Sequence, residues 1–356
     1  MVLSFGANRL PSDEYLLFSL RETESNMILR PFKFVPYFKT VIWGGHKIAS
    51  YKGIVTDKNC IGESWEVSGV PGHESVVAEG PDKGLNLKEL IDKYKGELVG
   101  QPVYDRFGDK FPLLIKIIDA RRDLSVQVHP DDELAMKRHG SFGKTEMWYV
   151  VSETGGASLR IGFDRRVDAE TYAAAVADHT ICDLLRDHPI AAGDVFFLPA
   201  GRVHSIGAGA FIAEIQQTSD LTYRIYDYDR PGPDGKPREL HTELAKEAID
   251  YTVPDDYRTH YERIRNKDTE LVACPYFTTH LCDATFSVLC DYSALDSFVV
   301  LIFVAGAGEL VDSEGNRVAV RQGETVLIPA STRQVTLLPG HGGLRFLSSY
   351  IETPEE

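Results

Sequence analysis

The stretch GDVFFLPAGRVHSI (193–206) decides the fold, because a second stretch, GETVLIPASTRQVT (323–336), repeats its pattern. Each stretch begins with glycine and an acid, continues with four residues typical of a strand, and reaches Pro-Ala. This pattern predicts a turn, a strand, and a strand end marked by proline. Five positions after the proline stand His204 in the first stretch and Gln334 in the second. We therefore expect two related β-barrels, only the first of which keeps a potential metal ligand; the alternative is two unrelated hairpins with similar turns.

Short strand-like runs dominate the rest of the chain. Most are bounded by Gly, Pro, Asp or Asn, as in all-β sandwiches and barrels. Examples are FPLLIKII (111–118), EMWYVV (146–151), FIAEIQQ (211–217) and FVVLIFVAG (298–306). We therefore expect a mostly β protein.

The helical portion is expected to be small. Asn86 and Glu89 have the spacing of a capping box, which predicts a helix over about 86–98, and a second helix is expected over about 168–187. Shorter helices are expected at about Asp131 and after Thr242.

Composition also places a domain boundary. The segment 227–240 is rich in proline and glycine, and the charged stretch 254–268 follows soon after it. We expect a first domain over 1–250 that carries the functional residues, a linker over 251–264, and a second domain without metal over 265–356.

The overall composition excludes several classes of protein. Of the 356 residues, 43% are hydrophobic and 26% are charged, which is typical of a folded globular chain. No apolar run approaches the roughly 18 residues that a membrane helix needs, and the first 20 residues lack the pattern of a signal peptide. The net charge of −15 disfavours nucleic-acid binding, so a phosphorylated ligand would need a local basic pocket.

The cysteines indicate the compartment. There are five, an odd number, and none forms a CxxC pair. They predict reduced thiols in a cytoplasmic protein and do not indicate a cysteine-based zinc site.

Polar residues with the spacing of metal ligands occur in three segments. Gln127 and His129, in LSVQVHPDD, are two residues apart and so share one face of a strand. Lys144 and Glu146, in GKTEMWYVV, share a face by the same rule, and His204 follows the proline turn. Each pattern alone is common in ordinary strands and loops. Together, two imidazoles, a carboxylate and an amide oxygen suit Zn²⁺, and they would also hold Fe²⁺, Mn²⁺ or Co²⁺.

In this order along the chain, the motifs resemble those of the type I mannose-6-phosphate isomerases, a family of cupin β-barrels. The resemblance is strongest over 111–132, and it rests on the following motifs: Gln127-x-His129-Pro130, Lys144-x-Glu146 followed by Trp148-Tyr149, Pro199 with His204, and Ser219-Asp220-x3-Arg224. It implies a fold of two cupin-like (jelly-roll) β-barrels. The chain lacks the long helical insertion of the eukaryotic members and is closer to the short bacterial form. Around Arg224 it reads LTYRIYDYDR, which differs from the longer members.

The resemblance also implies the roles of individual residues. One Zn²⁺ ion per chain would be bound by Gln127, His129, Glu146 and His204. The active site would further contain Lys144, Glu214, Asp220 and Arg224, and Arg230 would lie near the substrate phosphate.

The implied reaction interconverts mannose 6-phosphate and fructose 6-phosphate through an enediol, with the metal as a Lewis acid. Lys144 is one candidate for the base, and a carboxylate or a metal-bound water is the other. Asp220 or Glu214 would open the sugar ring or relay protons. Arg224 and Arg230 offer contacts to phosphate, although ordinary pairing with nearby aspartates is the alternative.

Three other functions fit parts of the pattern. A cupin oxygenase would use a similar metal site, but the glutamine ligand and the pair Lys144 and Arg224 argue against it. The others are an isomerase of another sugar and a non-catalytic phosphosugar-binding cupin. In each isomerase or binding function the partner is a small phosphosugar, and the sequence carries no indication of oligomeric state.

Overall fold

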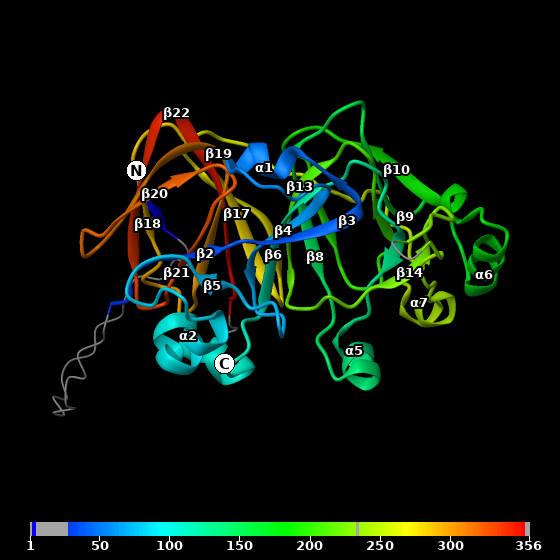
Figure 1. Ribbon diagram of the computed structural model, residues 1–356, viewed down its shortest axis with the longest axis horizontal. Helices are drawn as coiled ribbons and strands as arrows, with labels where there is room; N and C mark the ends of the chain where they lie inside the picture. Colours follow the sequence, from blue (N-terminus) through cyan, green and yellow to red (C-terminus); the bar gives the residue numbers. More distant parts are fainter. Residues whose placement is uncertain (1, 5–27, 233–234, 353–356) are drawn as a thin grey trace.

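The computed structural model describes residues 2–4, 28–232 and 235–352, and these form three β-sheets with short helices around them (Figure 1). The chain is mostly β, as predicted. The first 20 residues, where no signal peptide is expected, lie largely outside the described residues.

Two sheets are built from strands between residues 37 and 259. The seven-stranded sheet has the order β15 (Arg258–Thr259), β11 (Val195–Leu198), β8 (Glu146–Ser152), β13 (Phe211–Gln217), β6 (Leu113–Asp119), β4 (Ile61–Ser68), β3 (Tyr37–Gly45). The five-stranded sheet has the order β10 (Leu185–Pro189), β9 (Ser158–Phe163), β12 (His204–Ile206), β7 (Val126–Val128), β14 (Tyr223–Tyr226).

The third sheet is built mainly from the C-terminal part of the chain. Its main path is β1 (Val2–Ser4), β18 (Val288–Asp291), β22 (Gln334–Tyr350), β19 (Val299–Asp312), β21 (Thr325–Ile328), β2 (Phe32–Val35), β5 (Val76–Val77). Attached to this path are β16 (Asp268–Cys274), β17 (Phe277–Ala284) and β20 (Arg317–Arg321). In the described part of the chain, strand pairing closes none of the three sheets on itself; they pack face to face instead.

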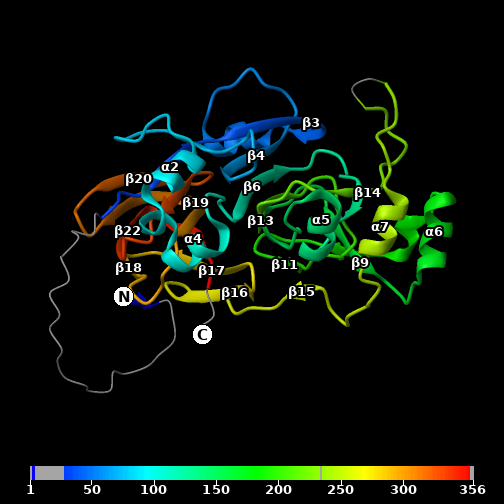
Figure 2. The ribbon, with the colours of Figure 1, turned by 90° about the horizontal axis from the view of Figure 1, so that it is seen from below.

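The seven-stranded sheet is the central layer (Figures 1 and 2). Along β6, Ile115 and Ile117 pack in one core with strands of the third sheet, whereas Ile118 packs in another core with the five-stranded sheet. Because both faces are covered, the strand is apolar at nearly every position rather than at every second one. The exceptions are Lys116 and, at the end of the strand, Asp119, and both are also buried.

The third sheet bends through two long strands. β19 and β22 each change register near the middle, and β19 pairs with β21 at one end and with β20 at the other. Gly306 lies at the bend with φ +83°, and a Cβ there would lie 2.1 Å from the carbonyl oxygen of Gly343. Only glycine fits this close approach of two strands.

The helices are short, and most lie beside the sheets (Figure 2). They are α1 (Lys47–Lys52), α2 (Leu87–Tyr94), α3 (Gly96–Val99), α4 (Gln101–Phe107), α5 (Asp132–His139), α6 (Ala169–Ala177) and α7 (Thr242–Ala248). Residues of α6 and α7 cover the outer face of the five-stranded sheet, opposite the central layer.

Most expected helices are confirmed. The capping box of Asn86 and Glu89 is formed at the start of α2, and α5 and α7 begin close to the expected residues. The helix expected over 86–98 is divided in two at Lys95, which has φ +47°.

The prediction of one helix over 168–187 is wrong for the second half of that segment. α6 is capped by the Asp168 side chain but ends at Ala177, and a 3₁₀ turn over Ile181–Leu184 follows. His179 has φ +58°, which a continuing helix does not allow. From Leu185 onward the chain pairs with β9 as β10, so strand pairing overrides the helical pattern.

The N-terminal strands connect the two halves of the molecule. β2 pairs with β21, and β1 pairs with β18, so both lie in the sheet built from residues beyond 265. The division at the linker 251–264 stays a prediction. Among the described residues, none of the helices combines the length and the apolar character needed to cross a membrane.

Candidate active site

Three candidate metal ligands lie together between the five-stranded and seven-stranded sheets. His129 Nε2 lies 3.6 Å from Glu146 Oε2, and His204 Nε2 lies 3.4 Å from Glu146 Oε1. One ligand atom from each residue lies within 4.8 Å of the others, and all three side chains are buried. This cluster can hold a metal ion.

Hydrogen bonds fix the orientation of both imidazoles. Nδ1 of His129 donates to the carbonyl oxygen of Leu221, and Nδ1 of His204 donates to that of Arg202, each at 2.8 Å. The Nε2 lone pairs are therefore left to face Glu146. Burial and the Lys144 charge lower the pKa of His129 well below its usual range and that of His204 to about 4, so both are neutral at pH 7, as metal ligands must be.

Glu146 is a buried carboxylate with one cation beside it and no well-formed hydrogen bond from the described residues. Neither of its oxygens accepts a hydrogen bond of good geometry from the described residues, and the nearest cation is Lys144 Nζ, 2.9 Å from Oε2. Burial raises the pKa of Glu146, although the Lys144 charge opposes this. A buried carboxylate is costly unless it is paired or bound to a metal.

The cross-strand register places further polar side chains beside this cluster. Gln127 pairs with His204 on one neighbouring strand and with Arg224 on the other, so the three lie in one row. The Gln127 amide lies 3.2 Å from His204 Nε2. Because the oxygen and nitrogen of an amide can exchange places by rotation, this end of Gln127 can present either atom to the cluster.

A second row crosses the seven-stranded sheet. Trp65, Lys116, Glu214 and Trp148 are successive cross-strand partners. Lys116 Nζ lies 2.9 Å from Glu214 Oε1, and Trp148 Nε1 donates to Glu214 Oε2 at 2.9 Å. Burial alone would raise the pKa of Glu214, but Lys116 and Lys144 hold it well below its usual range.

Lys116, the partner of Glu214 in this ion pair, is held in its charged form. Burial alone would lower the pKa of Lys116, but the negative charges of Glu214 and Glu63 outweigh burial and raise it. The site therefore contains a fixed ion pair beside the metal-ligand cluster.

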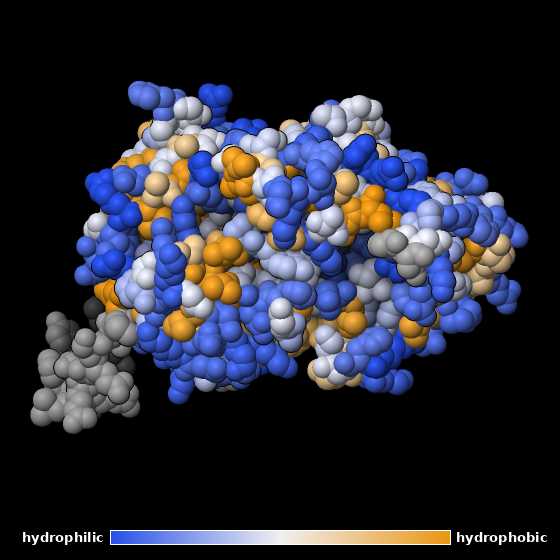
Figure 3. All heavy atoms as spheres, viewed as in Figure 1, coloured by the Kyte–Doolittle hydropathy of each residue, from blue (hydrophilic) through white to orange (hydrophobic). Residues whose placement is uncertain are grey.

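A cavity of about 420 Å³ opens over both rows. Gln127, Lys144, Glu214, Asp220 and Arg224 line it, so five of the predicted site residues meet at one opening. Trp43, Glu63 and Trp65, from β3 and β4, line it as well. The face in Figure 3 is hollowed where β3 and β14 approach each other in Figure 1.

Comparison with known proteins identifies the family of this chain. Residues 32–147 match the family model described as phosphomannose isomerase type I, catalytic domain. The chain is 36% identical over 306 residues to mannose-6-phosphate isomerase ManA of Bacillus subtilis, which covers 85% of this chain and 94% of that protein. The chain belongs to the type I mannose-6-phosphate isomerase family.

Two further matches agree. The mannose-6-phosphate isomerase of Streptococcus mutans is 36% identical over 292 residues, covering 81% of this chain and 89% of that protein. A crystal structure of the Bacillus subtilis mannose 6-phosphate isomerase superposes with a TM-score of 0.81 at 31% identity, covering 90% of this chain and 99% of that one. This match confirms the predicted mostly β, cupin-like fold, although within the described residues the sheets pack face to face and do not close into the two expected barrels.

Among the residues expected in a type I isomerase site, Arg230 lies elsewhere. It is not among the residues that line the cavity. Its guanidinium instead donates to Asp227 and to the carbonyl oxygen of Asp123. Asp227 is a buried carboxylate, and its ion pair with Arg230 provides the Arg230 guanidinium with a partner away from the cavity.

Arg238 takes the place at the cavity that was expected for Arg230. It also pairs with Asp227, through Nε at 2.7 Å and Nη2 at 2.6 Å, but it lines the cavity beside Arg224. Burial and the nearby charge of Arg238 lower the pKa of Arg224, and the buried Nε of Arg224 has no hydrogen-bond partner in the described part of the chain. Arg224 and Arg238 are therefore the two arginines that line this cavity among the described residues.

Sequence reasoning missed Lys116 and Arg238. The signal for Lys116 was present, because a single lysine inside LLIKII has no polar face to occupy and lysine is almost never buried without a partner. Arg238 gave no signal, since it lies in a proline-rich loop whose path depends on tertiary contacts.

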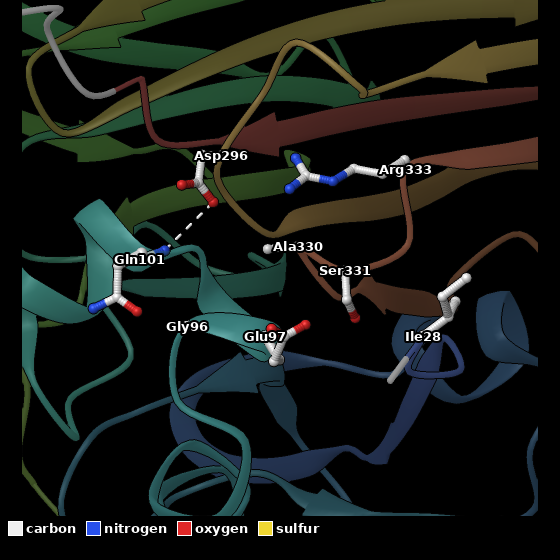
Figure 4. A pocket seen from close by; sticks show the side chains of 8 residues that line it. All are labelled: Ile28, Gly96, Glu97, Gln101, Asp296, Ala330, Ser331 and Arg333. Atoms are coloured by element: carbon white, nitrogen blue, oxygen red, sulfur yellow. Dashed lines mark hydrogen bonds between the residues drawn. The ribbon is translucent and has the colours of Figure 1, made fainter. Parts of the chain in front are cut away.

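A second cavity of similar size, about 400 Å³, lies between α3 and the turn that follows β21 (Figure 4). Its polar side chains include Glu97, Gln101, Asp296 and Arg333. No cluster of candidate metal ligands from the described residues adjoins it. Chemistry rather than volume therefore selects the first cavity as the candidate active site.

Proposed function

We propose that this protein interconverts mannose 6-phosphate and fructose 6-phosphate with one Zn²⁺ ion bound to His129, Glu146, His204 and Gln127. The observation that carries the proposal is the buried cluster beside a polar cavity: a carboxylate that accepts no well-formed hydrogen bond from the described residues faces two neutral imidazoles. Four zinc ligands lie about 3.3–3.7 Å from one another when their bonds to the metal are about 2.0–2.3 Å long. The separations of 3.6 and 3.4 Å from the two imidazoles to the two Glu146 oxygens fall in that range, whereas one ligand atom from each of the three residues lies within 4.8 Å of the others, a slightly wider spacing than in a formed zinc site.

The bound metal would act as a Lewis acid and stabilise negative charge on the sugar oxygens during isomerisation. The protein's own residues must then move a proton from C2 of the aldose to C1, with an enediol between the two sugars. A positioned base contributes about 10²–10⁴-fold to such a step.

Lys144 is the residue that we assign to this proton transfer. Its Nζ lies 2.9 Å from Glu146 and 3.1 Å from His129 Nε2, and the side chain lines the cavity. Glu214 is a weaker candidate, because both of its oxygens already accept hydrogen bonds and its pKa is lowered. We assign to Glu214 the role of holding Lys116 charged at the cavity wall.

Asp220 is our candidate for opening the sugar ring. It lines the cavity, and its side chain is exposed rather than held in an ion pair. A carboxylate in such a position can exchange a proton with a ring oxygen and with solvent.

Arg224 and Arg238 are our candidates for binding the substrate phosphate. Guanidinium groups form charge-assisted and often bidentate contacts with phosphate. Two of them at one cavity would let a chain of net charge −15 bind a dianion.

We also propose that the protein works in the reducing cytoplasm. All five cysteines are free thiols, and none is positioned as a metal ligand within the described residues. Free thiols persist in reducing compartments.

The experiment that tests the function is a coupled assay that follows fructose 6-phosphate formation from mannose 6-phosphate, with zinc-loaded protein and an EDTA-treated sample. We expect turnover that EDTA abolishes and zinc restores. If the protein turned over another phosphosugar but not mannose 6-phosphate, that other sugar would be its substrate. If it bound the phosphosugar without any turnover, it would not be an isomerase.

A further inference from the structure

A second cationic cleft lies in the C-terminal half of the molecule. It has a volume of about 330 Å³, and it shares no lining residue with the substrate cavity. Its charged lining residues are Arg263, Arg265, Asp283 and Arg345, and His341 lines it as well. We call it the Arg265 cleft.

The charges of the Arg265 cleft are unbalanced. Asp283 Oδ2 accepts from Arg263 Nε at 3.0 Å and lies 3.5 Å from Arg345 Nη2, so one carboxylate serves two guanidinium groups. Arg265 and His341 are exposed, and neither has an ion-pair or hydrogen-bond partner among the residues that the structure describes. Three arginines therefore face a single carboxylate in a protein with 53 acidic and 38 basic residues.

The walls of the cleft are held in place by the fold. Arg345 and Asp283 are cross-strand partners on β22 and β17. The Asn266 Oδ1 accepts from the backbone amide of Thr285 at 2.7 Å, and the Asn266 amide nitrogen donates to Thr285 Oγ1 at 3.0 Å, which fixes the loop that carries Arg265. The cationic groups are thus brought together by strand register and by a loop with its own hydrogen bonds.

Donor groups are available among the residues that line the cleft. Arg345 Nε is buried and has no hydrogen-bond partner in the described part of the chain. The backbone at Gly342 is open, because a Cβ there would meet no atom within 4 Å. A ligand can therefore approach the main chain as well as the guanidinium groups.

We propose that the Arg265 cleft binds a phosphate group, either as inorganic phosphate or as a small phosphomonoester, separately from the active site. A tetrahedral dianion presents several acceptor oxygens, which match guanidinium donors arriving from different elements. The cleft is also large enough for a phosphate with a small organic group attached.

The proposal is tested by titrating inorganic phosphate, and separately glycerol 3-phosphate, into the zinc-loaded protein by calorimetry. The variant is Arg265→Ser, and the matched control is Arg166→Ser, an exposed arginine between β9 and α6. We expect Arg265→Ser to weaken one binding event at least fivefold while leaving turnover of mannose 6-phosphate unchanged, and we expect the control to match the wild type. Tighter binding of inorganic phosphate would identify the free ion as the ligand, and tighter binding of glycerol 3-phosphate would identify a small phosphomonoester.

Equal affinity and stoichiometry for wild type and Arg265→Ser, with either ligand, would overturn the proposal. Crystals soaked in tungstate give the location independently. An anomalous peak between Arg265 and Arg345 is expected, and peaks confined to the active-site cavity would also overturn it. Because no residue is shared, neither result bears on the isomerase function.

Discussion

Lys144 lies close to two candidate metal ligands without itself being one, so its contribution can be separated from theirs. We expect Lys144→Met to retain one metal ion per chain and to lose about 10²–10⁴-fold in turnover, because the group that moves the proton is removed. Metal content by elemental analysis and kcat from the coupled assay check this. Lys137→Met, on the exposed face of α5, is the matched control. Near-normal turnover in Lys144→Met would exclude this lysine from the proton transfer.

Arg238 and Arg230 share Asp227 but differ in what else they reach, and this difference can be measured. We expect Arg238→Ala to raise KM about tenfold or more with little change in kcat, because a hydrogen bond to a charged group contributes about 1.5–3 kcal/mol. Arg230→Gln should change KM far less, since Arg230 does not line the cavity. The reverse order of effects would return the phosphate contact to Arg230.

Spacing in the sequence predicts which side chains share a strand face, but it does not predict loop paths. Gln127 and His129 were expected on one face of a strand, and the neighbouring Val126 and Val128 pack on the other face, against the helices outside the sheet. Arg230 was expected at the phosphate from the resemblance alone. Whether Arg230 or Arg238 reaches the cavity depends on the path of the loop that is rich in proline and glycine and carries both arginines to Asp227. The local sequence pattern does not determine that path.

Alternation along strands connects the fold to the site. In β8, Glu146, Trp148 and Val150 face the five-stranded sheet, while Met147 and Tyr149 pack in the core shared with the third sheet. A shift of pairing by one residue would exchange these two sets. The cores on both sides therefore hold Glu146 in the only register that places it between the two histidines.

A substitution at Gly306 tests how much the close approach of β19 and β22 at their bend contributes to stability. We expect Gly306→Ala to destabilise the protein by more than about 2 kcal/mol, because the left-handed conformation costs about 1–2 kcal/mol for alanine and the new Cβ meets the Gly343 carbonyl. Gly315→Ala is the matched control, with φ +80° and no atom within 4 Å of the added Cβ. Chemical denaturation measures both, and equal losses would mean that the close approach has no cost of its own.

The failure of the helix expected over 168–187 has a similar cause. Local pattern favours a helix through this segment, but the residues after Leu185 complete the edge of the five-stranded sheet beside β9. Long-range pairing of this kind is not visible in a window of a few residues. The capping box at α2, by contrast, is a local feature, and it was predicted correctly.

The two halves of the molecule meet at a buried ion pair. Lys52, at the end of α1, donates to both oxygens of Glu66 at 2.8 Å and also to the carbonyl oxygen of Gly323 in the turn before β21. Tyr51 adds a hydrogen bond to the carbonyl oxygen of Val304 at 2.8 Å. The β3–β4 region, which supplies one wall of the cavity, is therefore anchored to the third sheet.

We expect Lys52→Met to destabilise the protein by about 3–5 kcal/mol, because it leaves the Glu66 carboxylate buried without its cation. The double variant Lys52→Met/Glu66→Gln should recover a large part of that loss, since the uncompensated charge is gone. Equilibrium unfolding of both variants checks this. If the single variant is as stable as the wild type, the pair does not hold the two halves together.

The measurement that most directly tests the metal-dependent isomerase is turnover of mannose 6-phosphate as Zn²⁺ is titrated into EDTA-stripped protein. The variant is His204→Asn, and its matched control is His179→Asn, where asparagine tolerates the left-handed backbone of an exposed residue. We predict that wild type and His179→Asn regain full activity at one equivalent of zinc, and that His204→Asn regains neither bound metal nor turnover. Full turnover in the stripped wild type, or in His204→Asn, would contradict a catalytic metal bound by this cluster.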